Sequence, residues 1–583
     1  MAPKKKHPGK PEGIHFVNAR PSSETERVRA QRMVRAHVGR WISDQTKDRD
    51  LPNPSNPIYS SSSSSSSVSA SFRPSAHNPP PSRTLISRSR STDHPAQSLT
   101  LRQWPTFPQP HPSDYSDSSD DGASPPQFND PSAVMPWQRK PHIEREVNRI
   151  LDPFDTLPSR FPREIIDSCE NYLLKVLWPS LLPIGPRSRQ GPGESWFPLS
   201  LTDPALFNAF LYASMCHQRA QWLNGWIPHA DYGPSQAKFL ALIEMESIQL
   251  ISQAVRDPSR AVSDAVLLSV ICMMHHQAPD STRTTRYKKT PFNAPHQRLQ
   301  WMDVYGCLPP NMIHATGLKQ LVKMRGGLKN IKSGGLAQII SFSEVFSAAL
   351  LGAQPIFDFW PLDESRLGLS VQELLGFTPE ETQCNFGRFH HIGFTPQLSE
   401  ALQALTTYTI RLQASLAGAT DVALLADQRN MTIYTLMSVP SAADISTTFR
   451  SPAQEATYEM CRLTAQIYGV GVVFPLPAQN TPLPLLAKHI RAILCHPTSS
   501  PLWSSPDFRI PMLWTITLAG IAAFGALERP FFVSALSHTS RHYGIRSWAE
   551  LKRILQIVLW YDLACDQAGE ALWDEAMNFH PTM

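Results

Sequence analysis

Apolar residues recur at helical spacing from about residue 137 to the end of the chain, and this periodicity constrains the fold most strongly. Residues three, four and seven positions apart lie on one face of a helix, so each stripe predicts a helix with one buried side. Runs of alternating β-branched residues are scarce, and no strand-helix-strand alternation is present. We therefore predict an all-α fold in which helices pack on helices. The expected helices cover 203–222, 234–256, 259–277, 311–325, 335–350, 397–417, 452–471, 484–496, 508–527, 530–543, 547–561 and 563–577.

Two shorter stretches complete this prediction. A stripe of apolar residues runs from Phe161 to Leu177 and ends before Pro179. Residues 278–300 are basic and polar, so they are expected to form an exposed loop.

The apolar run from Ile510 to Leu527 is 18 residues long, at the lower edge of what spans a bilayer. Because it contains a proline, threonines and a glycine, we expect a buried core helix there and no membrane association.

Composition divides the chain into three predicted parts. Residues 1–50 are a basic arm, 51–135 are a Ser/Pro-rich linker, and 136–583 are the large multi-helix domain. The linker holds an unbroken serine run from Ser60 to Ser67 and cannot bury enough apolar surface to offset the entropy of ordering. It is therefore expected to be disordered.

Positive charge is concentrated in the arm. Residues 1–50 hold 12 Lys/Arg and 6 Asp/Glu, whereas the rest of the chain holds 42 and 43. A local excess of positive charge suits an acidic partner such as nucleic acid or an import receptor. The run Lys4, Lys5 and Lys6 is typical of a short nuclear-import signal, which predicts a nuclear location and an import receptor as partner.

Residues 22–49 are expected to form a basic amphipathic helix within the arm. Ala30, Val34, Val38 and Trp41 make one apolar stripe, and arginines spread around the rest. Three uses stay open: weak contact with DNA phosphates, docking on a protein partner, or a solvated arm. The arginines that would make nucleic-acid or import contacts are Arg27, Arg32, Arg35 and Arg40.

A helix with a double-glycine end stands out in the large domain. Asn311 is placed to cap its start, after two prolines. Gly326 and Gly327 are placed to supply the left-handed turn at its end, where other residues meet a steric penalty. One helical face carries His314, Gly317, Leu318, Leu321, Val322 and Arg325.

No catalytic, cofactor or metal site is predicted, and we expect no enzyme. The eight cysteines include no CxxC pair, which argues against a local zinc finger or zinc cluster. The side chains of His275 and His276 point about 100° apart on a helix, so they are poorly placed to bind one metal ion together. We interpret them as core or surface histidines. The segment 191–195 is assigned to a Pro-rich loop with no useful motif.

The double-glycine helix resembles the fungal-specific transcription-factor domain, the helical regulatory region of zinc-binuclear-cluster regulators. The resemblance rests on His314, Gly317, Leu318, Arg325, Gly326 and Gly327, followed by Gly335-Leu336. Other stretches agree with it: 151–158, 518–523 with Arg529, and Trp548, Leu555, Trp560, Leu572 and Trp573. The segments 16–18 and 34–38 also resemble a subgroup that lacks the zinc cluster.

The chain departs from the family pattern in its missing six-cysteine DNA-binding cluster, so sequence-specific DNA binding is not implied. An acidic residue expected after the glycines is assigned to Glu344. The resemblance implies a nuclear transcription regulator whose helical domain serves regulation, homodimerisation, effector binding or contact with regulatory proteins. A protein-interaction scaffold that has lost DNA binding is the alternative. An enzyme or small-molecule-binding protein is a more remote one.

Overall fold

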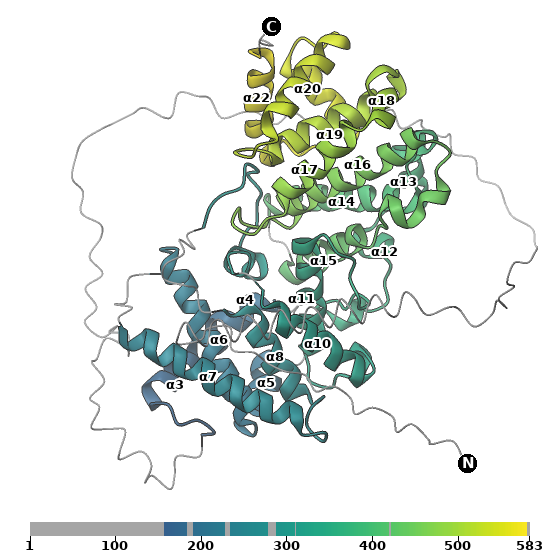
Figure 1. The fold of residues 1–583 in the computed structure, drawn as a ribbon. Helices are drawn as coiled ribbons and strands as arrows, with labels where there is room; N and C mark the ends of the chain where they lie inside the picture. Colours follow the sequence, from purple (N-terminus) through teal and green to yellow (C-terminus); the bar gives the residue numbers. More distant parts are fainter. Residues whose placement is uncertain are drawn as a thin grey trace, which may run out of the picture. The chain divides into compact units, whose positions relative to one another are not determined.

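The structure is a computed structural model, and it describes residues 157–183, 191–227, 234–277, 287–308, 310–418 and 421–579 (Figure 1). Every regular element in these ranges is a helix, which confirms the all-α prediction. The basic arm, the linker and the boundaries at 50 and 135 lie outside the described residues, so they stay predictions. None of the described helices is long and apolar enough to cross a bilayer.

The first group of helices packs around α6 and α8. Helix α6 contacts α7 and α8, α8 contacts α10, and α3 and α5 pack on α6 (Figure 1). Asp203 caps α6 by accepting from the backbone N–H groups of Ala205 and Leu206, and Ser263 caps α8. Their bounds are α3 Arg163–Tyr172, α4 Trp178–Leu181, α5 Pro192–Leu201, α6 Pro204–Leu223, α7 Pro234–Arg256, α8 Asp264–His275, α9 Met302–Tyr305 and α10 Met312–Arg325.

The remaining helices follow as two further sets of contacts. Helix α11 packs on α15, which in turn packs on α14, and α16, α17, α19, α20 and α22 contact one another in sequence. The bounds are α11 Leu336–Leu351, α12 Val371–Leu375, α13 Pro379–Phe386, α14 Pro396–Ser415, α15 Val422–Met437, α16 Pro452–Tyr468, α17 Leu483–Leu494, α18 Ser500–Ser504, α19 Arg509–Ala522, α20 Arg529–His542, α21 Trp548–Leu555 and α22 Asp562–Met577.

Several details of the sequence-based assignment were wrong. The segment 191–195 was assigned to a loop, but α5 begins at Pro192, because a proline suits the first helical turn. The stripe that begins at Phe161 does not stop at Pro179: a π-helical turn at Leu173–Leu177 leads into α4, and the proline lies in its first turn. Helix α15 was not predicted. In the segment 278–300, the described part is not wholly exposed, since Phe292 and Gln300 are buried.

The apolar run near the C-terminus behaves as the core helix that was expected. Helix α19 covers its first part, and all residues from Pro511 to Ala522 are buried. The helix ends before the predicted bound of 527, and Leu527 is 91% exposed in the turn that follows. The interior position of α19 explains why its sequence is apolar on all sides.

The double-glycine helix ends as its sequence predicts. Asn311 caps α10 by accepting from the N–H groups of Ile313 and His314. Gly326 and Gly327 have φ values of 88° and 93°, in the region that favours glycine. A Cβ atom at Gly326 would lie 2.5 Å from Nδ2 of Asn330, whose side chain donates to the carbonyl groups of Arg325 and Gly326.

We expect Gly326→Val to lower the free energy of unfolding by about 2–3 kcal/mol. A left-handed backbone costs a residue with a Cβ roughly 1–2 kcal/mol, and the displaced Asn330 amide loses hydrogen bonds worth about 1 kcal/mol. Urea unfolding measures the change. Lys323→Val, at an exposed position in the last turn of the same helix, is the control and should cost well under 1 kcal/mol. Equal effects of the two substitutions would contradict the assignment.

Candidate functional site

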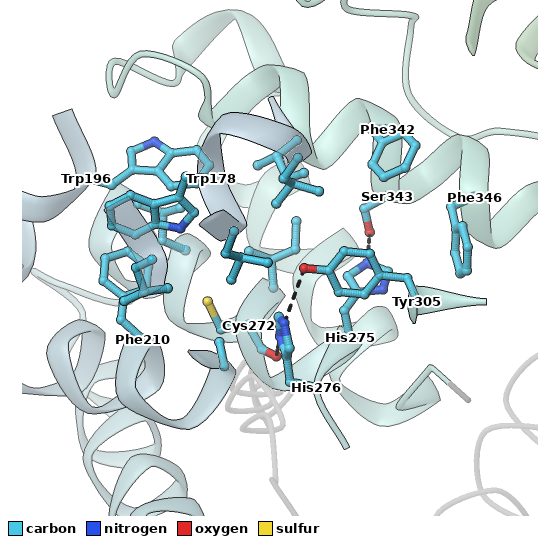
Figure 2. A pocket seen from close by; sticks show the side chains of 17 residues that line it. Trp178, Trp196, Phe210, Cys272, His275, His276, Tyr305, Phe342, Ser343 and Phe346 are labelled. Carbon is cyan, nitrogen blue, oxygen red and sulfur yellow. Dashed lines mark hydrogen bonds between the residues drawn. The ribbon is translucent and has the colours of Figure 1, made fainter. Parts of the chain in front are cut away.

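A cavity lies among α4, α5, α6, α8 and α11 (Figure 2). Its volume is about 50 Å³. Its wall is almost wholly aromatic and aliphatic. The labelled residues in Figure 2 are Trp178, Trp196, Phe210, Cys272, His275, His276, Tyr305, Phe342, Ser343 and Phe346.

Three aromatic side chains build one end of the cavity. The ring of Trp178 meets Trp196 and Phe210 edge to face, with centroids 5.6 and 5.0 Å apart. The indole Nε1 of Trp196 donates to the Gly334 carbonyl at 2.8 Å, which fixes the ring against the start of α11. Edge-to-face packing of rings is favourable. These three rings and their contacts define the shape of this end of the cavity.

Two histidines at the end of α8 form the polar edge. The ring nitrogen Nδ1 of His276 lies 2.9 Å from the Cys272 carbonyl, so this nitrogen carries the proton and donates. Its other nitrogen, Nε2, can then accept from the Tyr305 hydroxyl at 3.3 Å. His275 Nε2 lies 2.5 Å from the hydroxyl of Ser343 on α11. The polar groups at this edge are thus satisfied by one another.

A third histidine lies behind this edge. His217 of α6 is buried, and its Nδ1 lies 2.7 Å from the Tyr172 hydroxyl. Gln221 donates its amide to the same hydroxyl, so the tyrosine in turn donates to the imidazole. The imidazole also meets the Trp301 ring edge to face at 4.8 Å.

Burial keeps these groups in their uncharged forms. Desolvation lowers the pKa of His275 to about 3 and of His276 to about 4, and it lowers the pKa of His217 well below its ordinary value. The neighbouring His276 lowers the pKa of His275 and of His217 further. Burial also raises the pKa of the Cys272 thiol to about 12, so it is no thiolate at neutral pH. The site thus offers a neutral surface and no activated nucleophile.

The segment that carries Tyr305 is held in an unusual backbone conformation. His296, Gln300 and Trp301 all have positive φ values, near 51–56°. Such values cost residues with a Cβ energy and persist only where surrounding contacts hold them. Here the Gln300 amide donates to the Leu181 carbonyl and the Trp301 indole donates to the Leu177 carbonyl, each at 3.0 Å. These bonds attach the segment to α4 and its preceding π-turn.

Arg429 of α15 holds the same segment from the other side. Its guanidinium is 1% exposed and donates to the Leu299 carbonyl at 3.0 Å and to the Gln300 side-chain oxygen at 2.6 Å. The charge lies 4.8 Å from the Phe474 ring centroid and 5.9 Å from that of Phe342. No carboxylate of the described residues pairs with it, and burial lowers its pKa to about 10. Amide and carbonyl oxygens with aromatic faces therefore stabilise this cation.

The residues singled out from the sequence lie beside the cavity instead of lining it. His314, Gly317 and Leu318 are buried on α10, which packs on α8. Arg325 donates to the Val262 carbonyl and to Asp264, both at 2.8 Å. It thereby anchors the first turn of α8, the helix that carries His275 and His276. Glu344 pairs with Lys319 of α10 at 3.0 Å. Lys4, Lys5, Lys6, Arg27, Arg32, Arg35 and Arg40 lie outside the described residues.

Sequence reasoning did not predict the cavity. It singled out His275 and His276 and read them as satisfied histidines, but it gave Trp178, Trp196 and Tyr305 no role. Aromatic residues at helical spacing indicate a core, and nothing in their order tells which of them leave a gap. Among the described residues, no group of three or more His, Cys, Asp or Glu side chains is placed to hold a metal ion.

A pair of alanines on α6 tests whether the space is real. Ala213 lines the cavity, whereas Ala209 is fully buried one turn earlier and does not. We expect Ala213→Val to raise the free energy of unfolding by up to about 1 kcal/mol, because it fills empty volume. The control Ala209→Val should lower it by about 1–3 kcal/mol through overpacking. Chemical unfolding measures both, and equal losses would show that the space is already filled.

The described residues thus form an all-helical domain with an apolar cavity whose histidines are uncharged. The chain matches the model of the fungal specific transcription factor domain over residues 170–560. This match covers more than half of the chain, so the protein belongs to that family. Comparisons with curated proteins and with solved structures found no match. The family consists of transcription regulators rather than enzymes, and such regulators generally act in the nucleus through DNA or regulatory proteins.

Proposed function

We propose that this protein is a nuclear transcription regulator that works without a zinc-cluster DNA-binding domain. The observation that carries the proposal is the family match over 170–560. The eight cysteines lack the close spacing of a zinc cluster, so DNA contact falls to the basic arm. The arm gives nuclear import and weak, sequence-independent binding through Lys4, Lys5, Lys6, Arg27, Arg32, Arg35 and Arg40. The helical domain serves regulation, by homodimerisation, by contact with regulatory proteins or by an effector.

Chromatin occupancy of the tagged full-length protein tests this proposal. We expect nuclear residence, occupancy at a set of promoters, and altered transcript levels when the gene is deleted. A variant that lacks residues 1–50 should lose occupancy or nuclear entry. A full-length protein that stays outside the nucleus, with no transcript change on its deletion, would overturn the proposal.

A second candidate is an interaction scaffold that keeps the helical domain and binds no DNA. The missing cysteine cluster favours it. Electrophoretic mobility of DNA at about 0.15 M salt separates the two candidates, since phosphate contacts survive there only when several cations act together. Direct binding predicts retardation that weakens at least several-fold in Arg32→Ser/Arg35→Ser. The matched control Lys288→Ser/Lys289→Ser removes two exposed lysines of the helical domain and should leave binding unchanged.

The neutral state of the cavity supports a regulatory role over a catalytic one. General acid-base catalysis needs a group whose pKa lies near the working pH, whereas burial lowers the pKa of His275 to about 3 and of His276 to about 4. The Cys272 thiol, with its pKa raised to about 12, is a poor nucleophile. Binding of an uncharged effector is the chemistry that this lining suits best.

A further inference from the structure

We propose that the cavity among α4, α5, α6, α8 and α11 binds a small neutral apolar molecule, no larger than one aromatic ring, and that this ligand regulates the domain. The proposal has two parts. That the ligand regulates the domain, the regulatory half, rests on the proposed function above. That the cavity binds the ligand, the binding half, rests on the cavity alone. The ligand class follows from the lining, the closed polar edge and the volume.

The lining selects against water and against charge. Among the described residues that line the cavity there is no Asp, Glu, Lys or Arg. A water molecule needs two to four polar partners, and an apolar cavity without them stays dry. A charged ligand would lose its hydration and gain no counter-ion in return. An uncharged apolar molecule loses far less hydration energy than a charged one, and it gains van der Waals contacts with the walls.

The polar groups at the edge of the cavity need no hydrogen bond from a ligand. His275 is bonded to Ser343, and His276 is bonded to the Cys272 carbonyl and to Tyr305. A ligand that took one of these partners would leave another buried group without a hydrogen bond, which is costly. The edge therefore acts as a closed wall, and the aromatic end supplies the contacts. Trp178, Trp196 and Phe210 already meet edge to face, and their rings offer apolar surface with which a flat ring makes favourable contacts.

The volume sets the upper size of the ligand. About 50 Å³ is several times the ~10–15 Å³ that one water needs, but only about a third of the ~150 Å³ of an engineered cavity that binds benzene. A xenon atom or a few carbon atoms enter with little change. A single aromatic ring requires the walls to move outward and open roughly 100 Å³ more, and two fused rings require a still larger expansion.

Occupancy of the cavity has a route to the rest of the domain. Phe342 and Phe346 of α11 line the cavity, and each lies with its ring centroid 6.2 Å from that of Phe474. Phe342 also lies under the buried charge of Arg429. A ligand that moves α11 outward must therefore change the packing around α15. This contact chain links the cavity to the part of the domain beyond it.

Thermal unfolding of the purified full-length protein tests the binding half. The probes are xenon, benzene, indole as a two-ring compound, and benzoate as the charged match of benzene. We expect xenon and benzene to raise the unfolding midpoint, by roughly 3 °C for benzene at about a hundredfold excess over its Kd. Indole and benzoate should give no shift. The fluorescence of Trp178 and Trp196, which form the wall, should change with benzene and not with benzoate.

Two alanine variants provide the controls. Ala213→Val fills the cavity and should abolish the benzene shift, whereas Ala568→Val on α22, outside the cavity, should preserve it. Absence of a shift with xenon and benzene in the wild type, an equal shift with benzoate, or a shift that survives in Ala213→Val would overturn the binding proposal. None of these outcomes bears on chromatin occupancy, which tests the proposed function separately.

Transcript levels in cells that carry Ala213→Val test the regulatory half. Because the substitution keeps the cavity filled, we expect it to change the transcripts that respond to deletion of the gene. Ala568→Val should leave them unchanged. Transcript levels that match the wild type in Ala213→Val cells, beside lost benzene binding, would overturn the regulatory half and leave a binding site without a regulatory output.

Discussion

Acidification from pH 7 to pH 5 is expected to unfold the helical domain or bring it close to unfolding. Burial lowers the pKa of His275 to about 3, of His276 and His314 to about 4, and of His217 well below its ordinary value. The pKa of the more exposed His296 is lowered as well, and we count only the first four below. In the unfolded chain these groups take up protons near pH 6.5. Between pH 6.5 and their folded pKa values, the unfolded state binds more protons, so stability is lost as the pH falls.

The size of this effect follows from proton linkage. Each histidine contributes a slope that rises from about 0.7 kcal/mol per pH unit at pH 6.5 towards about 1.4, so four of them remove about 6–7 kcal/mol between pH 6.5 and 5. Typical stabilities of 5–15 kcal/mol leave little margin for such a loss. Carboxyl groups act in the opposite direction, because burial raises the pKa of Asp303 and Glu170 as well as that of Asp427. Burial raises the pKa of Asp427 to about 6, so this carboxyl adds stability as the pH falls from 6 to its ordinary value.

The slope of the free energy of unfolding against pH is the quantity to measure. We expect a net uptake of up to about three protons on unfolding between pH 6 and 5, from these four histidines less Asp427. His276→Gln should reduce this uptake by about one proton, while Leu527→Gln, at an exposed position without a titratable group, should not change it. A stability that stays flat from pH 7 to 5 would show that these histidines are already charged or hydrated in the folded protein.

Truncation of the buried guanidinium is the second large expected effect. Arg429→Ala should lower the free energy of unfolding by about 3–5 kcal/mol, because it leaves a cavity and removes donors from the Leu299 carbonyl and the Asn430 side-chain oxygen. Arg429→Met should cost less, since it fills the volume and removes a charge that no carboxylate balances. Denaturant unfolding measures both changes.

The matched control is Arg553→Ala, on the exposed face of α21. The free energy of unfolding of this variant should lie within about 0.5 kcal/mol of that of the wild type, as for most surface substitutions. Near-neutral Arg429→Ala would mean that the guanidinium contributes no more than an exposed arginine does. It would also remove the physical reason for the positive φ values at Gln300 and Trp301.

The helices that the sequence predicted well are those with a cap and a one-sided apolar stripe. Helix α10, with Asn311 at its start and Gly326 at its end, is the best example. Helix α15 was missed because it is buried on most sides and carries Asp427, Gln428, Arg429 and Asn430 in its interior. A run of four polar residues breaks the apolar periodicity, and only tertiary partners such as Gln300 and Arg366 explain why it is helical.

The cavity could not be predicted for a different reason. Its walls come from segments as distant as Trp178 and Phe346, and its volume depends on how edge-to-face rings fit together. Local sequence sets which residues are apolar, but the gap between them is a property of three-dimensional packing. The anchoring role of Arg325 was equally hidden, because its partner Asp264 lies 61 residues earlier.

The bond between Arg429 and Gln300 also bears on how the protein is made. These residues are separated by 129 positions, so the strained segment beside α4 waits for its last partner while the ribosome adds that length. At about 5–20 residues per second, the delay is on the order of 10 s. A nascent chain that stops before α15 should therefore lack the guanidinium that bonds the Leu299 carbonyl and the Gln300 side chain. Fragments that end there are poor candidates for expression, and the domain should be produced whole.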